Sequence, residues 1–146
     1  MMRRIFIDAN VLIAGADSRS GASNALLQLA EVGLFGVVVS RQVLDEAERN
    51  VRKKLPRALP TLAALLAQLP MEIVPDPPDA ECLRWAGFIE LKDTPIVAAA
   101  VLAGVDRLVT LNRKDFTPAV AEAIGIPILS PGELIQDIRR IVEENL

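Results

Sequence analysis

Carboxylate side chains recur along this sequence at positions where they could act together. The first, Asp8, directly follows the apolar run at residues 5–7. A carboxylate at the end of a buried strand is costly unless it caps a turn or faces a cation. Further acids stand near the ends of predicted strands or the starts of predicted helices, namely Asp45, Glu46, Glu48, Asp93 and Asp115. If these acids meet in the fold, they need a counter-charge.

The residue types that the chain lacks exclude several kinds of catalytic and metal site. It contains no histidine and no tyrosine, which excludes Ser-His-Asp triads, histidine acid–base pairs and histidine-ligated zinc. The single cysteine, Cys82, excludes an internal disulfide and a cysteine-cluster metal site. Carboxylates that gather without a base repel one another, and a divalent cation removes that conflict. Oxygen-only ligands favour Mg²⁺ or Mn²⁺.

The chain is rich in apolar residues. Of its 146 residues, 51% are apolar and the mean hydropathy is +0.34, so we expect a homodimer or a protein partner to cover exposed apolar surface. The net charge of −3 offers no global attraction for nucleic acid, and polyanion binding would need a local patch. The longest apolar stretch, at residues 96–105, is about half of a bilayer span, and no secretory leader precedes it. We therefore expect a soluble, cytoplasmic protein.

Alternating strand and helix patterns predict the framework that positions the acids. Apolar runs predict strands at residues 5–7, 35–40, 71–74, 107–110 and 127–129. Helical patterns fill most of the intervening segments, at residues 24–32, 42–54, 61–69, 80–90, 95–103, 118–124 and about 131–146. This order predicts one domain over residues 1–146, a three-layer α/β/α fold with a central parallel sheet of about five strands. The last helix is expected to pack on that domain or on a partner.

Ligands of such sheets bind beyond the carboxyl ends of the strands. All the acids fall at this end of the predicted sheet. They can converge only if the strand order places their segments side by side. Helical periodicity does not choose between Asp45 and Glu46, because both lie off the apolar stripe of their helix.

Several segments together resemble the PIN-domain ribonucleases, including the VapC-like toxins of toxin–antitoxin pairs. Residues 5–14 resemble the opening strand of that family with its first acid and following Asn, and residues 40–46 resemble its Ser-to-Glu segment. The remaining matches are the central Asp-containing helix at residues 92–100, the Thr-x-Asn-x-x-Asp-Phe signature at 110–116 and the closing turn at 129–134. Each motif is weak alone, but their order and spacing cover almost the whole chain.

The resemblance implies a function and a set of site residues. It implies an endoribonuclease that uses Mg²⁺ or Mn²⁺, acts on RNA, leaves a 5′-phosphate and pairs with an antitoxin protein. The metal-binding and catalytic quartet that it implies is Asp8, Glu46, Asp93 and Asp115. The hydrogen-bonding support that it implies is Asn10, Thr110 and Asn112.

Basic residues occur at two places that suit a polyanionic substrate. Arg113 and Lys114 lie beside Asp115 and are the better placed for substrate binding. A basic run at residues 49–57 is the candidate phosphate-tracking patch, and a solvated helix end explains it equally well.

Two other functions fit parts of the pattern. A receiver-like phosphoacceptor module also binds Mg²⁺ at strand ends, but it needs a phosphorylatable Asp after the third strand, where Asp76 stands among prolines. A non-catalytic protein of the PIN fold that works by binding a partner is favoured by the high apolar content and by an Asn at position 112.

Overall fold

A five-stranded parallel sheet forms the centre of the molecule, in a computed structural model that describes residues 2–145. The strands are β1 (Arg4–Ile7), β2 (Gly36–Ser40), β3 (Met71–Val74), β4 (Arg107–Val109) and β5 (Ile128–Leu129). Their order is β3-β2-β1-β4-β5, and every neighbouring pair is parallel. This confirms the predicted α/β class and parallel sheet.

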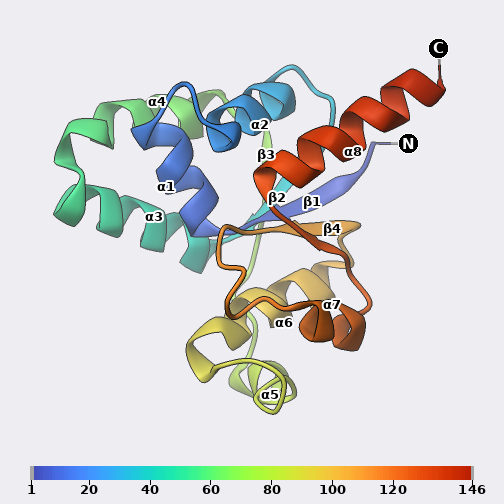
Figure 1. Ribbon diagram of the computed structural model, residues 1–146. Helices are drawn as coiled ribbons and strands as arrows, with labels where there is room; N and C mark the ends of the chain where they lie inside the picture. Colours follow the sequence, from blue (N-terminus) through green and yellow to red (C-terminus); the bar gives the residue numbers. More distant parts are fainter. Residues whose placement is uncertain (1, 146) are drawn as a thin grey trace.

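Helices cover both faces of the sheet, as the three-layer prediction requires. Figure 1 shows α1–α4 and α8 on one side of the sheet and α5, α6 and α7 on the other. The helices are α1 (Ala9–Asp17), α2 (Ala22–Glu31), α3 (Arg41–Lys54), α4 (Leu59–Gln68), α5 (Asp79–Leu83), α6 (Thr94–Ala103), α7 (Pro118–Ile124) and α8 (Pro131–Glu144). Short 3₁₀ turns occur at Pro56–Ala58 and Leu91–Asp93. None of the helices between residues 2 and 145 is long and apolar enough to cross a bilayer.

Strand β1 is buried because helices pack on both of its faces. Ile5, Phe6 and Ile7 have no exposed surface, which explains why three consecutive apolar residues form this strand. The chain then leaves β1 toward β2 on one side and later returns to β4 on the other. The carboxyl ends of β1 and β4 therefore flank the point where the strand order reverses, the usual ligand position in open α/β sheets.

The segment at residues 80–90 differs from its predicted helix. Helix α5 ends at Leu83, and turns follow, with backbone bonds such as that from Phe88 N–H to the Trp85 carbonyl (3.0 Å). The half-buried Trp85 packs on the core, whereas Leu83 and Phe88 are 63% and 57% exposed. Because the large apolar side chains do not share one buried face, packing does not favour continuing the helix.

Helix α8 closes the fold behind a well-formed cap. Ser130 accepts the backbone N–H of Glu133 (3.2 Å), and the Glu133 side chain accepts the backbone N–H of Ser130 (2.9 Å). Leu134 is buried, and the helix lies against α2 and β5. The terminal helix thus packs on its own chain.

Candidate metal centre

Asp8 lies at the carboxyl end of β1 and is only 7% exposed. Its Oδ1 accepts the N–H of Ala9 (2.7 Å), which caps α1. Its Oδ2 accepts bonds from the Thr110 hydroxyl (2.8 Å) and from Nδ2 of Asn10 (3.3 Å). Burial raises the pKa of Asp8, whereas the bonds from Thr110 and Ala9 oppose that rise. The carboxylate is thus held in one orientation, beside the end of β4.

Thr110 links the ends of β1 and β4. Its hydroxyl donates to Asp8 and accepts from Nδ2 of Asn10 (3.1 Å) and from the backbone N–H of Asn112 (3.1 Å). Oδ1 of Asn10 in turn accepts the N–H of Leu111 (3.0 Å). The three residues expected to support the acids, Asn10, Thr110 and Asn112, therefore share one hydrogen-bond network with Asp8.

Replacing Thr110 by Val is expected to destabilise the fold by about 1–3 kcal/mol. The substitution keeps the shape of the side chain but removes one hydrogen-bond partner from the buried Asp8 carboxylate and one from the half-buried Asn10 amide. Urea denaturation measures the effect, and Thr110→Ser, which keeps the hydroxyl, serves as the matched control. A Val variant as stable as the Ser variant would show that the network does not hold this edge together.

Asp93 and Asp115 come together at the second part of the site. Oxygen atoms of Asp93, Asp115 and Glu90 all lie within 4.8 Å of one another. Burial raises the pKa of Asp93 to about 6, and the neighbouring Asp115 carboxylate adds to that rise. The pKa of Asp115 is lowered, chiefly because Nδ2 of Asn112 donates to its Oδ2 (3.0 Å). This is the electrostatic conflict that a cation would relieve.

The side chain of Asp93 does not cap the helix that follows it. Although Asp93 precedes α6, its side chain makes no capping bond to that helix. Its Oδ2 is fully buried and has no hydrogen-bond partner among the described residues. An ionised oxygen in that position needs a partner, because burying an unpaired charge is costly. A metal ion would supply one.

Glu46 is the half-buried member of the acidic group at the start of α3. Asp45 and Glu48 are exposed, and Glu48 pairs with Arg52 at 2.9 Å. The charge of Glu46 raises the pKa of Asp8, and the charge of Asp8 raises that of Asp93. The carboxylates thus interact electrostatically from β1 through α3 to α6, with Asp93 and Asp115 in the closest group.

Two residues beside the acids were missed by the sequence reasoning. Glu90 stands three residues before Asp93 across the 3₁₀ turn Leu91–Asp93, a geometry that puts residues i and i+3 on one side. Lys92 places its Nζ 3.6 Å from Glu90 Oε2 and 3.9 Å from Asp115 Oδ2, with a 69% exposed side chain. The Glu-x-x-Asp spacing was the available signal, but it becomes informative only if the turn is known.

The two basic residues of the signature, Arg113 and Lys114, differ in their contacts. Arg113 pairs with Glu133 at the first turn of α8. Lys114 is exposed, and its charge helps to lower the pKa of Asp115. Of the two, Lys114 is the residue that faces solvent without an ion pair among residues 2–145.

Asp76, the residue on which a receiver-like module would depend, has another contact. It follows the edge strand β3, and its Oδ1 accepts the backbone N–H of Gln42 at the start of α3 (2.8 Å). This contact gives Asp76 a capping role and does not favour a phosphoacceptor.

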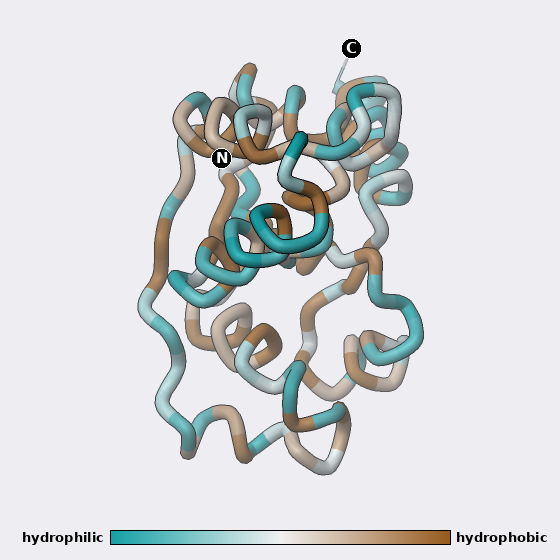
Figure 2. The backbone as a smooth tube through the Cα atoms, turned by 90° about the vertical axis from the view of Figure 1, so that its left-hand side faces the viewer, coloured by the Kyte–Doolittle hydropathy of each residue, from teal (hydrophilic) through white to brown (hydrophobic). Residues whose placement is uncertain are grey.

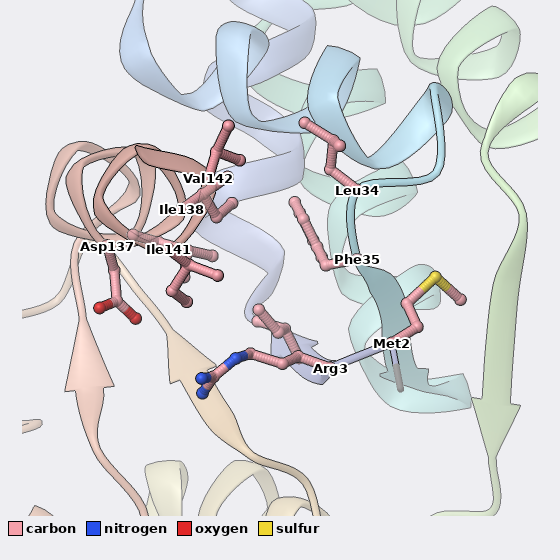
Figure 3. Close-up of a pocket in the computed structure, with 10 residues that line it drawn as sticks. Met2, Arg3, Leu34, Phe35, Asp137, Ile138, Ile141 and Val142 are labelled. Atoms are coloured by element: carbon pink, nitrogen blue, oxygen red, sulfur yellow. The ribbon is translucent and has the colours of Figure 1, made fainter. Parts of the chain in front are cut away.

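A separate apolar cavity lies near the amino end of β1, away from the carboxylate cluster. It has a volume of about 130 Å³ and lies between the start of β1, the loop before β2 and helix α8. Figure 3 shows Phe35, Leu34, Ile138 and Val142 around it. The one acid in its wall, Asp137, forms ion pairs with Arg107 and Arg140. The cavity therefore lacks the free oxygen ligands of the carboxylate cluster.

The donor set of the cluster fits a hard divalent cation. Oxygens of Glu90, Asp93 and Asp115 lie within 4.8 Å of one another, whereas Asp8 and Glu46 lie outside that group and act on it through their charge. Hydroxyl and amide groups fix Asp8 and Asp115 in place. Mg²⁺ and Mn²⁺ prefer such oxygen ligands and keep coordination positions for water and phosphate. The buried, unpartnered oxygen of Asp93 is the specific feature that an ion would satisfy.

Comparisons with known proteins bear on the family and the fold of this chain. A family model described as a PIN domain matches residues 4–114. PAE2754 from Pyrobaculum aerophilum is 18% identical and superimposes with a TM-score of 0.65, covering 94% of this chain and 90% of that one. No curated protein matches the chain.

Two further solved structures are described as a toxin and as a toxin–antitoxin complex. The Mycobacterium tuberculosis toxin VapC20, described as cleaving the sarcin-ricin loop, is 18% identical with a TM-score of 0.55, over 82% of this chain and 94% of that one. A toxin–antitoxin complex from Klebsiella pneumoniae is 20% identical with a TM-score of 0.61, over 87% of this chain and 97% of that one. At these identities the likeness establishes the fold.

Proposed function

This chain belongs to the PIN domain family, and on that premise we propose that it is a metal-dependent endoribonuclease and the toxin of a toxin–antitoxin pair. The metal-binding and catalytic residues of the proposal are Asp8, Glu46, Asp93 and Asp115. Asn10, Thr110 and Asn112 support them, and Arg113 and Lys114 are the proposed substrate-binding residues. The cofactor of the proposal is Mg²⁺ or Mn²⁺.

The observation that carries the proposal is the pairing of Asp93 with Asp115. Two carboxylates in contact, one with a buried oxygen that lacks a partner, are poorly arranged for stability and well arranged to bind a cation. Their position beyond the carboxyl ends of parallel strands is where α/β sheets bind ligands.

The chain's own residues would each have a defined task. A bound metal ion supplies Lewis acidity, which lowers the pKa of a coordinated water toward neutrality and stabilises charge on the phosphate. Asp93 and Asp115 would hold that ion, and both must be ionised to do so. Thr110 and Asn10 keep Asp8 aimed at the site, and Asn112 does the same for Asp115. No histidine is available for proton transfer, which suits a water activated by metal.

We further propose that the protein forms a homodimer, binds an antitoxin protein and works as a single cytoplasmic domain over residues 1–146. Exposed apolar side chains support a protein contact, with Val32, Leu34, Leu83 and Leu91 between 47% and 74% exposed. Of the similar solved structures, one is described as a toxin and another as a toxin–antitoxin complex, which supports the antitoxin.

Cleavage of RNA by the untagged protein tests the proposal. We expect cutting of single-stranded or structured RNA with Mn²⁺ or Mg²⁺, 5′-phosphate products and no cutting after chelation with EDTA. The tag must be removed, because histidines would bind metal themselves. Absence of cutting at millimolar Mn²⁺ across a broad RNA pool would refute the nuclease and leave the non-catalytic binding protein as the better description.

A further inference from the structure

One face of helix α3 carries Glu46 and, further along the helix, basic residues that form no ion pair among the described residues. Glu46 lies near the start of α3, and Arg49 and Lys53 follow it three and seven residues later. With 3.6 residues per turn, these spacings place all three on roughly the same face. The neighbouring face carries Val43, Ala47 and Val51, which are buried. Glu46 is half-buried, and Arg49 and Lys53 are exposed, so this face opens to solvent toward the end of the helix.

The two basic residues on this face form no ion pair within the described part of the chain. Arg49 and Lys53 are exposed, and neither forms an ion pair among the described residues, whereas Arg52 is paired with Glu48. Of the cations nearer to the acids, Arg113 pairs with Glu133 and Lys92 lies beside Glu90 and Asp115, whereas Lys114 forms no ion pair among residues 2–145. Arg49 and Lys53 are thus free for an external anion.

The direction of α3 suits an RNA strand that leads away from the metal site. Helix α3 begins directly after β2 and runs away from the sheet edge, as Figure 1 shows. In Figure 2, which looks at the side where α3 ends, the helix turns nearest the viewer are mainly teal. From Glu46 to Lys53 the helix rises by roughly 10 Å. That length matches about three stacked nucleotides at about 3.4 Å each.

We propose that Arg49 and Lys53 form the phosphate track of the RNA substrate, holding the backbone up to about three nucleotides from the cut. This inference rests on the proposed ribonuclease function and names where its substrate lies. A polyanion is the expected occupant because the acids around the scissile phosphate repel flanking phosphates, and a chain of net charge −3 attracts them only through a local patch. The contact is to backbone, so it carries no base specificity.

Cleavage kinetics of Arg49→Gln/Lys53→Gln against salt test the track. We expect KM to rise about tenfold while kcat stays within about twofold, because the residues bind phosphates and do not touch the reacting atoms. The slope of log affinity against log salt should fall by about 1.4, at about 0.7 for each lost single-strand contact. Mn²⁺ affinity, measured by calorimetry, should stay unchanged.

Arg19→Gln/Arg139→Gln is the matched control, since it removes the same charge at exposed positions outside the basic run at residues 49–57. A double variant of Arg49 and Lys53 that keeps the KM and salt slope of this control would overturn the track while leaving the nuclease intact. A wild type that neither cuts nor binds RNA would refute the ribonuclease itself. Crosslinking gives an independent test: 4-thiouridine placed about three nucleotides from the cut should label residues 49–57. Labelling confined to other segments would refute the track.

An acidic protein is the alternative occupant of this face. Polyglutamate that binds more tightly than RNA, and loses its binding in Arg49→Gln/Lys53→Gln, would overturn the RNA assignment. Inability of polyglutamate to compete with RNA would support it.

Discussion

Replacing Asp93 by Asn is expected to lower the rate of metal-dependent RNA cleavage by roughly 100-fold or more. Loss of a group that only orients a metal ligand already costs about 10–100-fold, and Asp93 is proposed as a direct ligand. The amide is nearly isosteric with the carboxylate but carries no negative charge. Single-turnover cleavage at saturating Mn²⁺ measures the effect.

Asp45→Asn is the matched control for that experiment. Asp45 is an exposed acid of α3 beside Glu46, and its loss removes the same charge. We expect its cleavage rate to stay close to that of the wild type. Full activity in Asp93→Asn, or a large loss in Asp45→Asn, would contradict the assignment of the carboxylates.

Mn²⁺ affinity is expected to fall about tenfold for each pH unit below pH 6. The pKa of Asp93 in the metal-free protein is raised from its usual 3.8 to about 6, so below that pH a metal ion must displace a proton. Above about pH 7 the carboxyl is ionised, and affinity should level off. Titration calorimetry between pH 5 and 7.5 measures the dependence.

The number of protons released identifies the source of this effect. In buffers of different ionisation enthalpy, binding at pH 5 should release more protons than binding at pH 7.5. Affinity that stays constant from pH 5 to 7.5 would mean that Asp93 is not among the ligands.

The carboxyl edge of the sheet could be predicted because short local patterns decide it. Residues 5–7 are buried on both faces and were recognisable as a strand, so Asp8 had to follow at the strand end. The short strand Met71–Val74 and helix Pro118–Ile124 coincide with their predicted bounds. Since parallel strands end at one edge, the predicted sheet places Asp8 and Thr110 at the same edge, and the observed pairing of β1 with β4 makes them neighbours.

The region at residues 80–93 could not be predicted because tertiary contacts decide it. A helical pattern covered residues 80–90, yet Leu83 and Phe88 face outward and only a short helix forms. The following 3₁₀ turn brings Glu90 beside Asp93, and no apolar periodicity marks such a turn. The same turn directs Asp93 away from capping α6. These are local departures from regular structure, and they occur where the acids meet.

Anomalous diffraction from a crystal of the untagged protein grown with Mn²⁺ tests most directly whether the acids converge on a cation. We expect a manganese peak bound by oxygens of Asp93 and Asp115, with Asp8 and Glu46 facing it, and no such peak in crystals of Asp93→Asn. A well-ordered wild-type site without manganese at millimolar concentration, or a peak held only by other residues, would contradict the metal centre and with it the proposed nuclease.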